Sequence, residues 1–175
     1  RQLELIKFYC DNWNKDEMCI NKSRQCGLTV ITLGFILNEC LRNKGKYLFT
    51  FKGYNNSNEI EKMDRLEAVC IDCGIDFKRP YRNSLYINGN EITILQKMPL
   101  RLCEKRRIVC FYDEYAFSCE STLIRDCEKD LENYDNVLRI YASTPNGTND
   151  FLDKWMSSKN KFKINWKDTP NRGSH

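Results

Sequence analysis

The sequence predicts an α/β fold, in which a mainly parallel β-sheet is sandwiched by helices. Short apolar runs typical of strands alternate with longer stretches typical of helices, and this alternation indicates βαβ units. The length of 175 residues suits one domain, and no repeat, low-complexity segment or Pro/Gly-rich linker divides it. Hydrophobic residues at 41% and charged residues at 30% are typical of an ordinary globular domain.

The first half of the chain indicates three helices and two strands. The segment 28–43 is apolar on almost every side, which predicts a helix buried within the fold. A helix over 58–70 is indicated by apolar residues at three-residue steps from Ile60 to Val69, with Asn58 as its N-cap. The elements expected in this half are helices at 3–8, 28–43 and 58–70 and strands at 17–21 and 47–51.

The second half opens with a hairpin signal in the segment 84–95. Asn88 and Gly89 separate two β-rich runs there, and this dipeptide favours a tight turn because both residues accept a positive φ. Ligands of parallel sheets bind beyond the carboxyl ends of the strands, so the residues that follow each strand are the first functional candidates. The remaining expected elements are strands at 107–112, 137–142 and 162–166 and helices at 121–132 and 149–158.

Composition limits the chemistry that is available. His175 is the only histidine, which excludes histidine-based catalysis and histidine-rich metal sites. Among ten cysteines only "CIDC" at 70–73 has ligand spacing, and without a second pair we expect free thiols rather than zinc. The formal charge of +4 permits contact with a polyanion without requiring it. The longest apolar stretch, around 28–41, is too short and polar to span a bilayer, so we expect no membrane partner.

The loop "KSRQCGLT" at 22–29 lies between a predicted strand and the predicted buried helix, where free backbone N–H groups can bind phosphate. The usual template is GxxxxGK[ST]. Gly27 matches its second glycine, and Thr29 matches the hydroxyl that binds Mg²⁺. However, Lys22 stands in the place of the first glycine and Leu28 in the place of the lysine. Taken alone, the loop is better explained as a basic turn before a core helix.

The chemistry of phosphate binding requires a cation within reach, and it can come from the start of the loop. Lys22 is the candidate for the cation of the β- and γ-phosphates, and Arg24 offers a planar fork for a second contact in cis. Ser23, Gln25 and Cys26 complete the predicted phosphate loop.

An acidic pair follows another predicted strand, in "VCFYDEYAF" at 109–117. A strand-end aspartate in a phosphate-loop site holds Mg²⁺, and this role is predicted for Asp113. Glu114, the next residue, is placed to polarise the attacking water. The alternative is a solvated strand end without a ligand.

A third strand end, "LRIYASTPNG" at 138–147, places the hydroxyls of Ser143 and Thr144 near a γ-phosphate. In this order "KSRQCGLT", "VCFYDEYAF" and "ASTPNGTNDFLDKW" resemble the ATPase domain of the large terminase subunit of tailed bacteriophages. The resemblance extends from about residue 2 to 170. It implies a P-loop NTPase fold of the additional-strand, catalytic-glutamate type, with ATP and Mg²⁺ as ligands.

The resemblance also implies a role for each matching residue. Lys22 and Arg24 resemble the phosphate-binding and catalytic cations, and Glu114 the catalytic glutamate. Thr29 and Asp113 resemble the magnesium ligands. The further nucleotide-binding residues that it implies are Gln2 at the adenine, the loop residues Ser23, Gln25, Cys26, Gly27 and Leu28, and the coupling residues Ser143 and Thr144, followed by Pro145.

The function implied is a Mg²⁺-dependent ATPase that couples hydrolysis to the translocation of double-stranded DNA into a procapsid. The implied partners are the portal of the procapsid, the small terminase subunit and further copies of the chain in a ring, in the cytoplasm of the host cell. Residues 1–175 would then form an N-terminally trimmed ATPase domain without the linking subdomain and the nuclease, so we expect no DNA cleavage.

Two alternatives remain open from the sequence. A superfamily-two helicase or translocase shares the sheet and the acidic pair, but the GKT loop is missing and the tail "TPNGTNDFLDKW" is unlike that class. A degenerate, non-catalytic nucleotide-binding module is the second alternative, with Leu28 as the mark of a decayed site.

Overall fold

The computed structural model describes residues 2–24, 26–52, 56–94 and 105–165, with the backbone alone at 56–58. The described helices are α1 (Gln2–Asn12), α2 (Leu28–Arg42), α3 (Asn56–Asp72), α4 (Thr122–Leu131) and α5 (Asp150–Ser157), with a 3-10 helix η1 (Tyr115–Phe117). The described strands are β1 (Glu17–Lys22), β2 (Tyr47–Lys52), β3 (Phe77–Tyr81), β4 (Ser84–Ile87), β5 (Asn90–Thr93), β6 (Arg107–Asp113), β7 (Val137–Ser143) and β8 (Lys161–Ile164).

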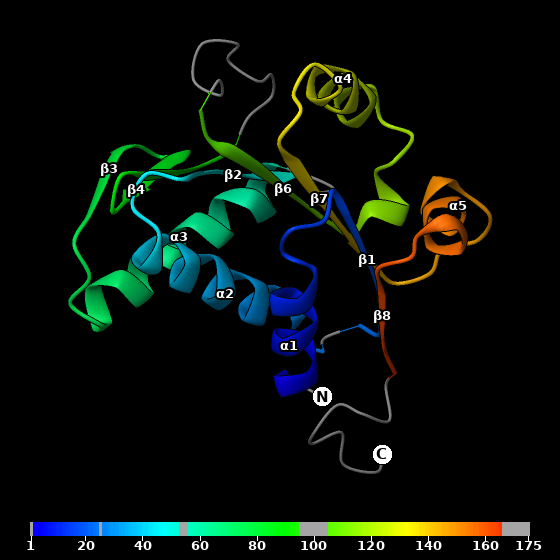
Figure 1. Ribbon diagram of the computed structural model, residues 1–175, viewed down its shortest axis with the longest axis horizontal. Coiled ribbons are helices and arrows are strands. Elements are labelled where there is room, and N and C mark those ends of the chain that lie inside the picture. Colours follow the sequence, from blue (N-terminus) through cyan, green and yellow to red (C-terminus); the bar gives the residue numbers. More distant parts are fainter. Residues whose placement is uncertain (1, 25, 53–55, 95–104, 166–175) are drawn as a thin grey trace.

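These strands form one sheet with the order β3-β4-β5-β2-β6-β7-β1-β8 (Figure 1). In this order, each strand from β5 to the edge strand β8 pairs with the next in parallel fashion. The pairs β3–β4 and β4–β5 are antiparallel. β7 lies between β1, which leads into the candidate phosphate loop, and β6, which ends at the acidic pair. This inserted strand is the feature that defines the additional-strand type, and it confirms the predicted fold class.

Helices cover both faces of the sheet because alternate residues of its central strands are apolar on both sides. On β6, Val109 and Phe111 belong to one buried cluster, while Ile108, Cys110 and Tyr112 belong to the other. The first cluster includes residues of α1, α2 and α3, and the second includes residues of η1, α4 and α5. Figure 1 shows these two groups of helices on opposite sides of the sheet.

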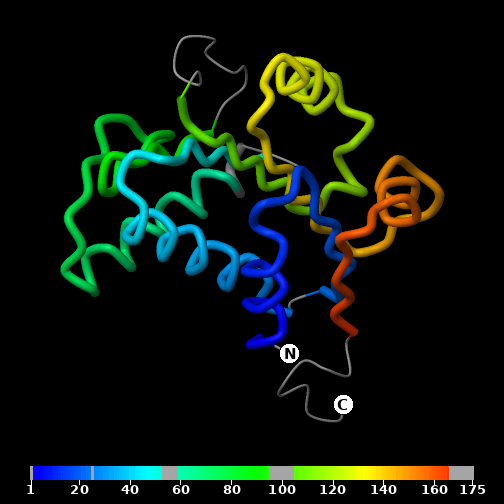
Figure 2. The backbone as a smooth tube through the Cα atoms, viewed as in Figure 1, coloured from blue at the N-terminus to red at the C-terminus, as the bar shows by residue number. Residues whose placement is uncertain are grey.

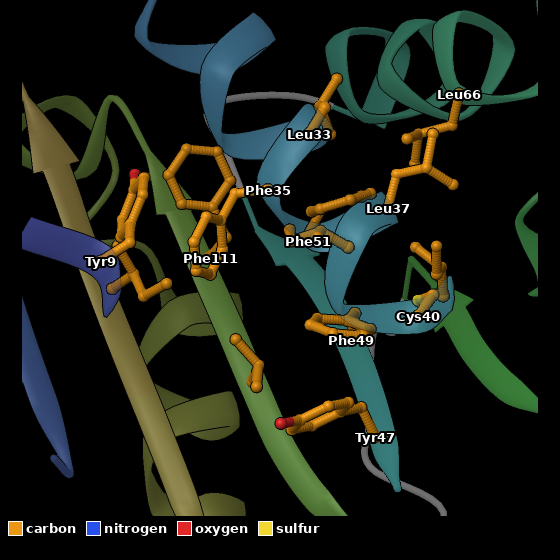
Figure 3. Close-up of a cluster of buried hydrophobic side chains, with 14 of the residues drawn as sticks. Tyr9, Leu33, Phe35, Leu37, Cys40, Tyr47, Phe49, Phe51, Leu66 and Phe111 are labelled. Atoms are coloured by element: carbon orange, nitrogen blue, oxygen red, sulfur yellow. The ribbon is translucent and has the colours of Figure 1, made fainter. Parts of the chain in front are cut away.

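α2 is buried along one face only, whereas Val30 and Leu41 on its other face are 59% and 46% exposed, so the expectation of a helix buried on almost every side is only partly met. In Figure 3, Cys40 of this helix lies close to Phe49 of β2 and Phe35 lies beside Phe111 of β6, while Leu37 lies beside Leu66 of α3. Full burial of one such side chain contributes about 1.5–3 kcal/mol. This packing holds α2 firmly in place.

The turn between β4 and β5 binds the C-terminal end of α2. Asn88 and Gly89 have φ values of 50° and 75°, so the tight turn that the dipeptide predicts is confirmed. The side chain of Asn88 donates to the carbonyl of Cys40 at 3.0 Å, and that of Asn90 donates to the same carbonyl at 3.0 Å. These bonds satisfy a carbonyl group that the end of the helix leaves open.

Two details of the predicted elements are wrong. α3 begins at Asn56, so Asn58 lies inside the helix rather than at its N-cap. Val69 is 43% exposed, because residues at three-residue steps drift around a helix of 3.6 residues per turn. β3 was not predicted, since it is a polar edge strand that contains Pro80.

No helix within the described ranges is long and apolar enough to cross a membrane.

Candidate functional site

The candidate phosphate loop is fixed at both of its ends. The backbone N–H of Ser23 donates to the carbonyl of Ile164 at 3.0 Å, which ties the start of the loop to β8, and Figure 2 shows the two segments side by side. Gly27 caps α2 with a φ of 76°, a conformation that favours glycine. The first helical bond from this cap runs from Ile31 N–H to Gly27 O, so the amides of 28–30 have no partner within the helix. Such a helix start attracts anions.

Lys22, the last residue of β1, reaches across the end of β7 to the acidic pair. Its Nζ lies 3.1 Å from Oδ1 of Asp113 and 2.6 Å from Oε1 of Glu114, although the residues are 91 and 92 positions apart. Lys22 is only 7% exposed. Burial lowers the pKa of its ammonium group, but the two carboxylates outweigh burial and the net pKa is raised. Lys22 therefore stays charged.

Asp113 is the centre of the site. Its Oδ2 accepts a hydrogen bond from the Thr29 hydroxyl at 3.0 Å and lies 3.4 Å from Nζ of Lys62 on α3. Burial raises the pKa of Asp113. Lys22, Lys62 and the Thr29 hydroxyl lower this pKa by more than burial raises it, so the net pKa lies below its ordinary value. An ionised carboxylate beside a hydroxyl is thus held at the carboxyl end of β6.

The oxygens of Thr29 and Asp113 fit a magnesium ion that is also bound by phosphate. Mg²⁺ prefers oxygen ligands and often takes only one or two carboxylates from a protein, with phosphates and waters completing its shell. Within the described ranges, no group of three or more His, Cys, Asp or Glu residues could hold a metal. The residues present therefore suit a shared protein–nucleotide site rather than an all-protein metal cage.

Glu114 has an unusual backbone conformation for a residue with a side chain. Its φ of 54° is left-handed, and it caps η1 directly after β6. Strained residues of this kind cluster at functional sites. Oε1 is bound to Lys22, while Oε2 is buried and has no hydrogen-bond partner in the described part of the chain. This carboxylate therefore has an open acceptor position for a water molecule.

The third predicted segment is bound to the turn that follows Glu114. Ser143 Oγ accepts from the backbone N–H of Ala116 at 3.1 Å. The side chains of Asn149 and Asn146 both donate to the carbonyl of Ala116, at 3.0 and 3.4 Å. Both backbone polar groups of Ala116 are thus held by the segment 143–149, which we call the Ala116 clamp.

Three other predicted residues lie in the core or on the surface. Leu28 is 1% exposed and packs in the core, so the position where the template has a lysine faces away from a ligand. Arg24 is exposed on the loop, and Gln2 is exposed at the first residue of α1. Gln25 lies outside the described residues.

The remaining predicted residues line the loop or the clamp. Cys26 is half-buried and packs against the core. The hydroxyls of Ser23 and Thr144 are buried and have no hydrogen-bond partner among the residues that the structure describes. Their roles, like those of the other site residues, stay predictions.

Sequence reasoning missed Lys62 and Glu59 on α3 and the two clamp asparagines. Lys62 is 6% exposed and Glu59 2% exposed, and they pair at 2.7 Å. Their spacing of three residues on a helix was visible, but such pairs are ordinary on solvated helix faces. Asn149 is the N-cap of α5, and its place before an amphipathic helix could have identified it.

No protein-family model matches the sequence, and no curated protein sequence matches it. Solved structures do match. The large terminase of a thermophilic bacteriophage, in complex with ATP-γ-S, superposes with a TM-score of 0.68 at 15% identity, over 97% of this chain and 45% of the phage chain. The ATPase domain of the large terminase of Thermus phage P74-26 gives 0.58 at 14% identity, over 85% and 75%. The chain has the fold of a large-terminase ATPase domain.

This fold confirms the resemblance that the three sequence segments indicate. The ADP complex of the first phage protein agrees, with a TM-score of 0.67 at 16% identity over 96% of this chain. The chain spans less than half the length of that terminase, 46% of it in the ADP complex. At such low identity the likeness shows the terminase ATPase fold, and the chemistry must be argued from the site.

Proposed function

We propose that the chain is the ATPase domain of a viral DNA-packaging motor and hydrolyses ATP in a Mg²⁺-dependent reaction. One observation carries the proposal: Lys22, Thr29, Asp113 and Glu114 converge within hydrogen-bond distance at the strand ends of a terminase ATPase fold. The comparison structures of the thermophilic phage terminase hold ADP and ATP-γ-S, which supports a nucleotide as the ligand here as well.

The phosphates of ATP would bind at the start of α2, with the open amides and the left-handed Gly27 allowing close approach. Lys22 would leave the acidic pair and turn to the β- and γ-phosphates, which carry more charge than the carboxylates. Arg24, on the same loop, would approach the phosphates from the solvent side. Because the core takes up Leu28, the phosphate cation has to come from the loop start.

Thr29 and Asp113 would hold Mg²⁺, which when bound neutralises charge on the phosphate oxygens. Glu114 would accept a hydrogen bond from water and orient it in line with the γ-phosphate. Departure of Lys22 to the phosphates frees Oε1 of Glu114 for this task. Lys22 would thus stabilise the acidic pair in the absence of ATP, and its departure when ATP binds would leave Glu114 free to accept a hydrogen bond from water.

Hydrolysis would reach the rest of the motor through the Ala116 clamp. Loss of the γ-phosphate changes the charges around Glu114, two residues before Ala116. The hydrogen bonds from Ser143, Asn146 and Asn149 transmit a shift of that turn to the start of α5. Such a local change at a packed turn is a common origin of larger movements.

The packaging role rests on the fold and on the three segments together. A motor of this kind grips the DNA phosphate backbone without base readout, so its affinity for double-stranded DNA depends strongly on salt. A ring of chains at the portal of a procapsid, the small terminase subunit as partner and the host cytoplasm as location belong to the same proposal. Cleavage of DNA is not expected from residues 1–175.

ATP turnover by the wild-type chain and three variants tests the proposal. Single-turnover hydrolysis of radiolabelled ATP with Mg²⁺ near neutral pH suits a slow isolated domain. Glu114→Gln should slow it about 100-fold or more, and Lys22→Ala should do the same, while Glu120→Gln on the exposed surface should not. Equal and negligible rates for every form would leave a non-catalytic nucleotide-binding module, and duplex unwinding would favour a helicase.

A further inference from the structure

The buried pair of Glu59 and Lys62 lies next to the predicted magnesium ligand and takes no part in the mechanism above. Both residues come from the first two turns of α3, and they are 2% and 6% exposed. Lys62 Nζ is 2.7 Å from Glu59 Oε1 and 3.4 Å from Asp113 Oδ2. The ammonium group is therefore shared between two carboxylates, and it lies closer to Glu59.

Lys62 and Thr29 meet the same oxygen of Asp113. Thr29 donates to Oδ2 at 3.0 Å, and Lys62 approaches Oδ2 at 3.4 Å, while Lys22 lies on Oδ1. The oxygen that faces Thr29 is the one a cation bridging Thr29 and Asp113 would use. A positive charge at this oxygen repels such a cation, so Lys62 must withdraw when the cation binds.

Glu59 offers the place to which Lys62 can withdraw. Its Oε2 is buried and has no hydrogen-bond partner in the part of the chain that the structure describes. An ammonium group carries three donors, so Lys62 can engage both oxygens of Glu59 after it leaves Asp113. Lys22 has its own alternative in the phosphates. Each cation that neutralises Asp113 in the free protein therefore has a second anion available.

We propose that Lys62 is a positioning residue that neutralises Asp113 while the site is empty and is transferred to Glu59 when a magnesium nucleotide binds. This inference rests on the proposed nucleotide site and adds to it a device that tunes metal affinity. Without Lys62, the buried Asp113 of the free protein would keep Lys22 as its remaining cation. Without Glu59, Lys62 would stay on Asp113 and compete with the metal.

The test is the Mg²⁺ dependence of nucleotide binding, which needs no turnover. Fluorescence anisotropy of a mant-ADP probe is followed as Mg²⁺ is titrated. Glu59→Gln should raise the half-saturating Mg²⁺ concentration about fivefold, because Lys62 keeps only Asp113 as its partner. Adding Lys62→Met to that variant should bring the concentration back to the wild-type value or below it. Glu61→Gln, which alters an exposed pair on the same helix, should leave it unchanged.

A purely structural pair gives the opposite pattern. The double variant would then bind as weakly as Glu59→Gln or more weakly, and this result would overturn the inference. Urea denaturation of each variant shows that it is folded before it is titrated. If Glu59→Gln does not fold, Lys62→Met alone is titrated in its place, and this variant should need less Mg²⁺ than the wild type. A wild-type chain that binds no mant-ADP at any Mg²⁺ concentration refutes the proposed function itself.

Discussion

Replacement of Lys22 by methionine tests the site in two independent ways. Methionine has a similar length and keeps the packing of the aliphatic stem, but it removes the charge that holds Asp113 at 3.1 Å and Glu114 at 2.6 Å. The free protein should lose stability because these carboxylates lose their cation. The nucleotide complex should lose affinity because the phosphates lose theirs.

The structure sets the size of the first effect. Removal of one partner from a fully buried ion pair costs about 3–5 kcal/mol. Here Asp113 keeps Lys62 and the Thr29 hydroxyl, and the Glu114 side chain is 36% exposed, so water can replace the lost ammonium group there. We therefore expect Lys22→Met to lower the free energy of unfolding by about 1–2 kcal/mol.

The loss of nucleotide affinity should be larger than the loss of stability. A hydrogen bond to a charged group contributes about 1.5–3 kcal/mol, so the loss of the phosphate cation should weaken nucleotide binding roughly 10- to 100-fold. Urea denaturation measures the first quantity and mant-ATP titration the second, with Lys44→Met, an exposed change, as the control. A variant that loses stability but binds nucleotide as tightly as the wild type would show that Lys22 serves only the fold.

Three further predictions concern the loop, the clamp and pH. Gly27→Ala should lower the free energy of unfolding by about 1–2 kcal/mol, because an added Cβ meets no atom within 4 Å and only the φ of 76° is unfavourable; urea denaturation measures this. Asn149→Ala should cost about 1 kcal/mol through the lost N-cap, whereas Asn149→Asp should keep the cap and lose the amide's bonds to the carbonyls of Ala116 and Asn146, so it should slow ATP turnover with a smaller loss of stability. The lowered pKa of Asp113 means that its stabilisation is complete above its ordinary value of 3.8 and is lost as the pH falls through the folded value. Wild type and Asp113→Asn should therefore converge in unfolding free energy as urea denaturation is repeated from pH ~6 down to ~2, and a constant gap would contradict this.

The sheet and most of the helices and strands could be predicted because strands that are buried on both faces appear in the sequence as short apolar runs. The run 47–51 and the helix 28–43 are mainly apolar, and they form β2 and α2, which both contribute to the larger buried cluster. β3 left no such trace, because an edge strand with Pro80 and charged side chains buries little apolar surface.

Most of the site residues that could be predicted lie at or directly after strand ends, and Thr29 was identified from the loop template. Lys22, Asp113 and Ser143 each terminate a strand, and parallel strands bring their carboxyl ends to one edge of the sheet. Lys62 lies in the middle of a helix, where neither a strand end nor a motif marks it. Only the rotation of α3 about its axis, which packing decides, turns this side chain toward Asp113.

A crystal structure with Mg²⁺ and a non-hydrolysable ATP analogue tests the central claim most directly. The triphosphate should lie at the start of α2, the metal should lie between Thr29 and Asp113, and the ammonium group of Lys22 should have moved from the acidic pair to the β- and γ-phosphates. Nucleotide bound elsewhere, or bound here with Lys22 still on Asp113 and Glu114, would contradict it.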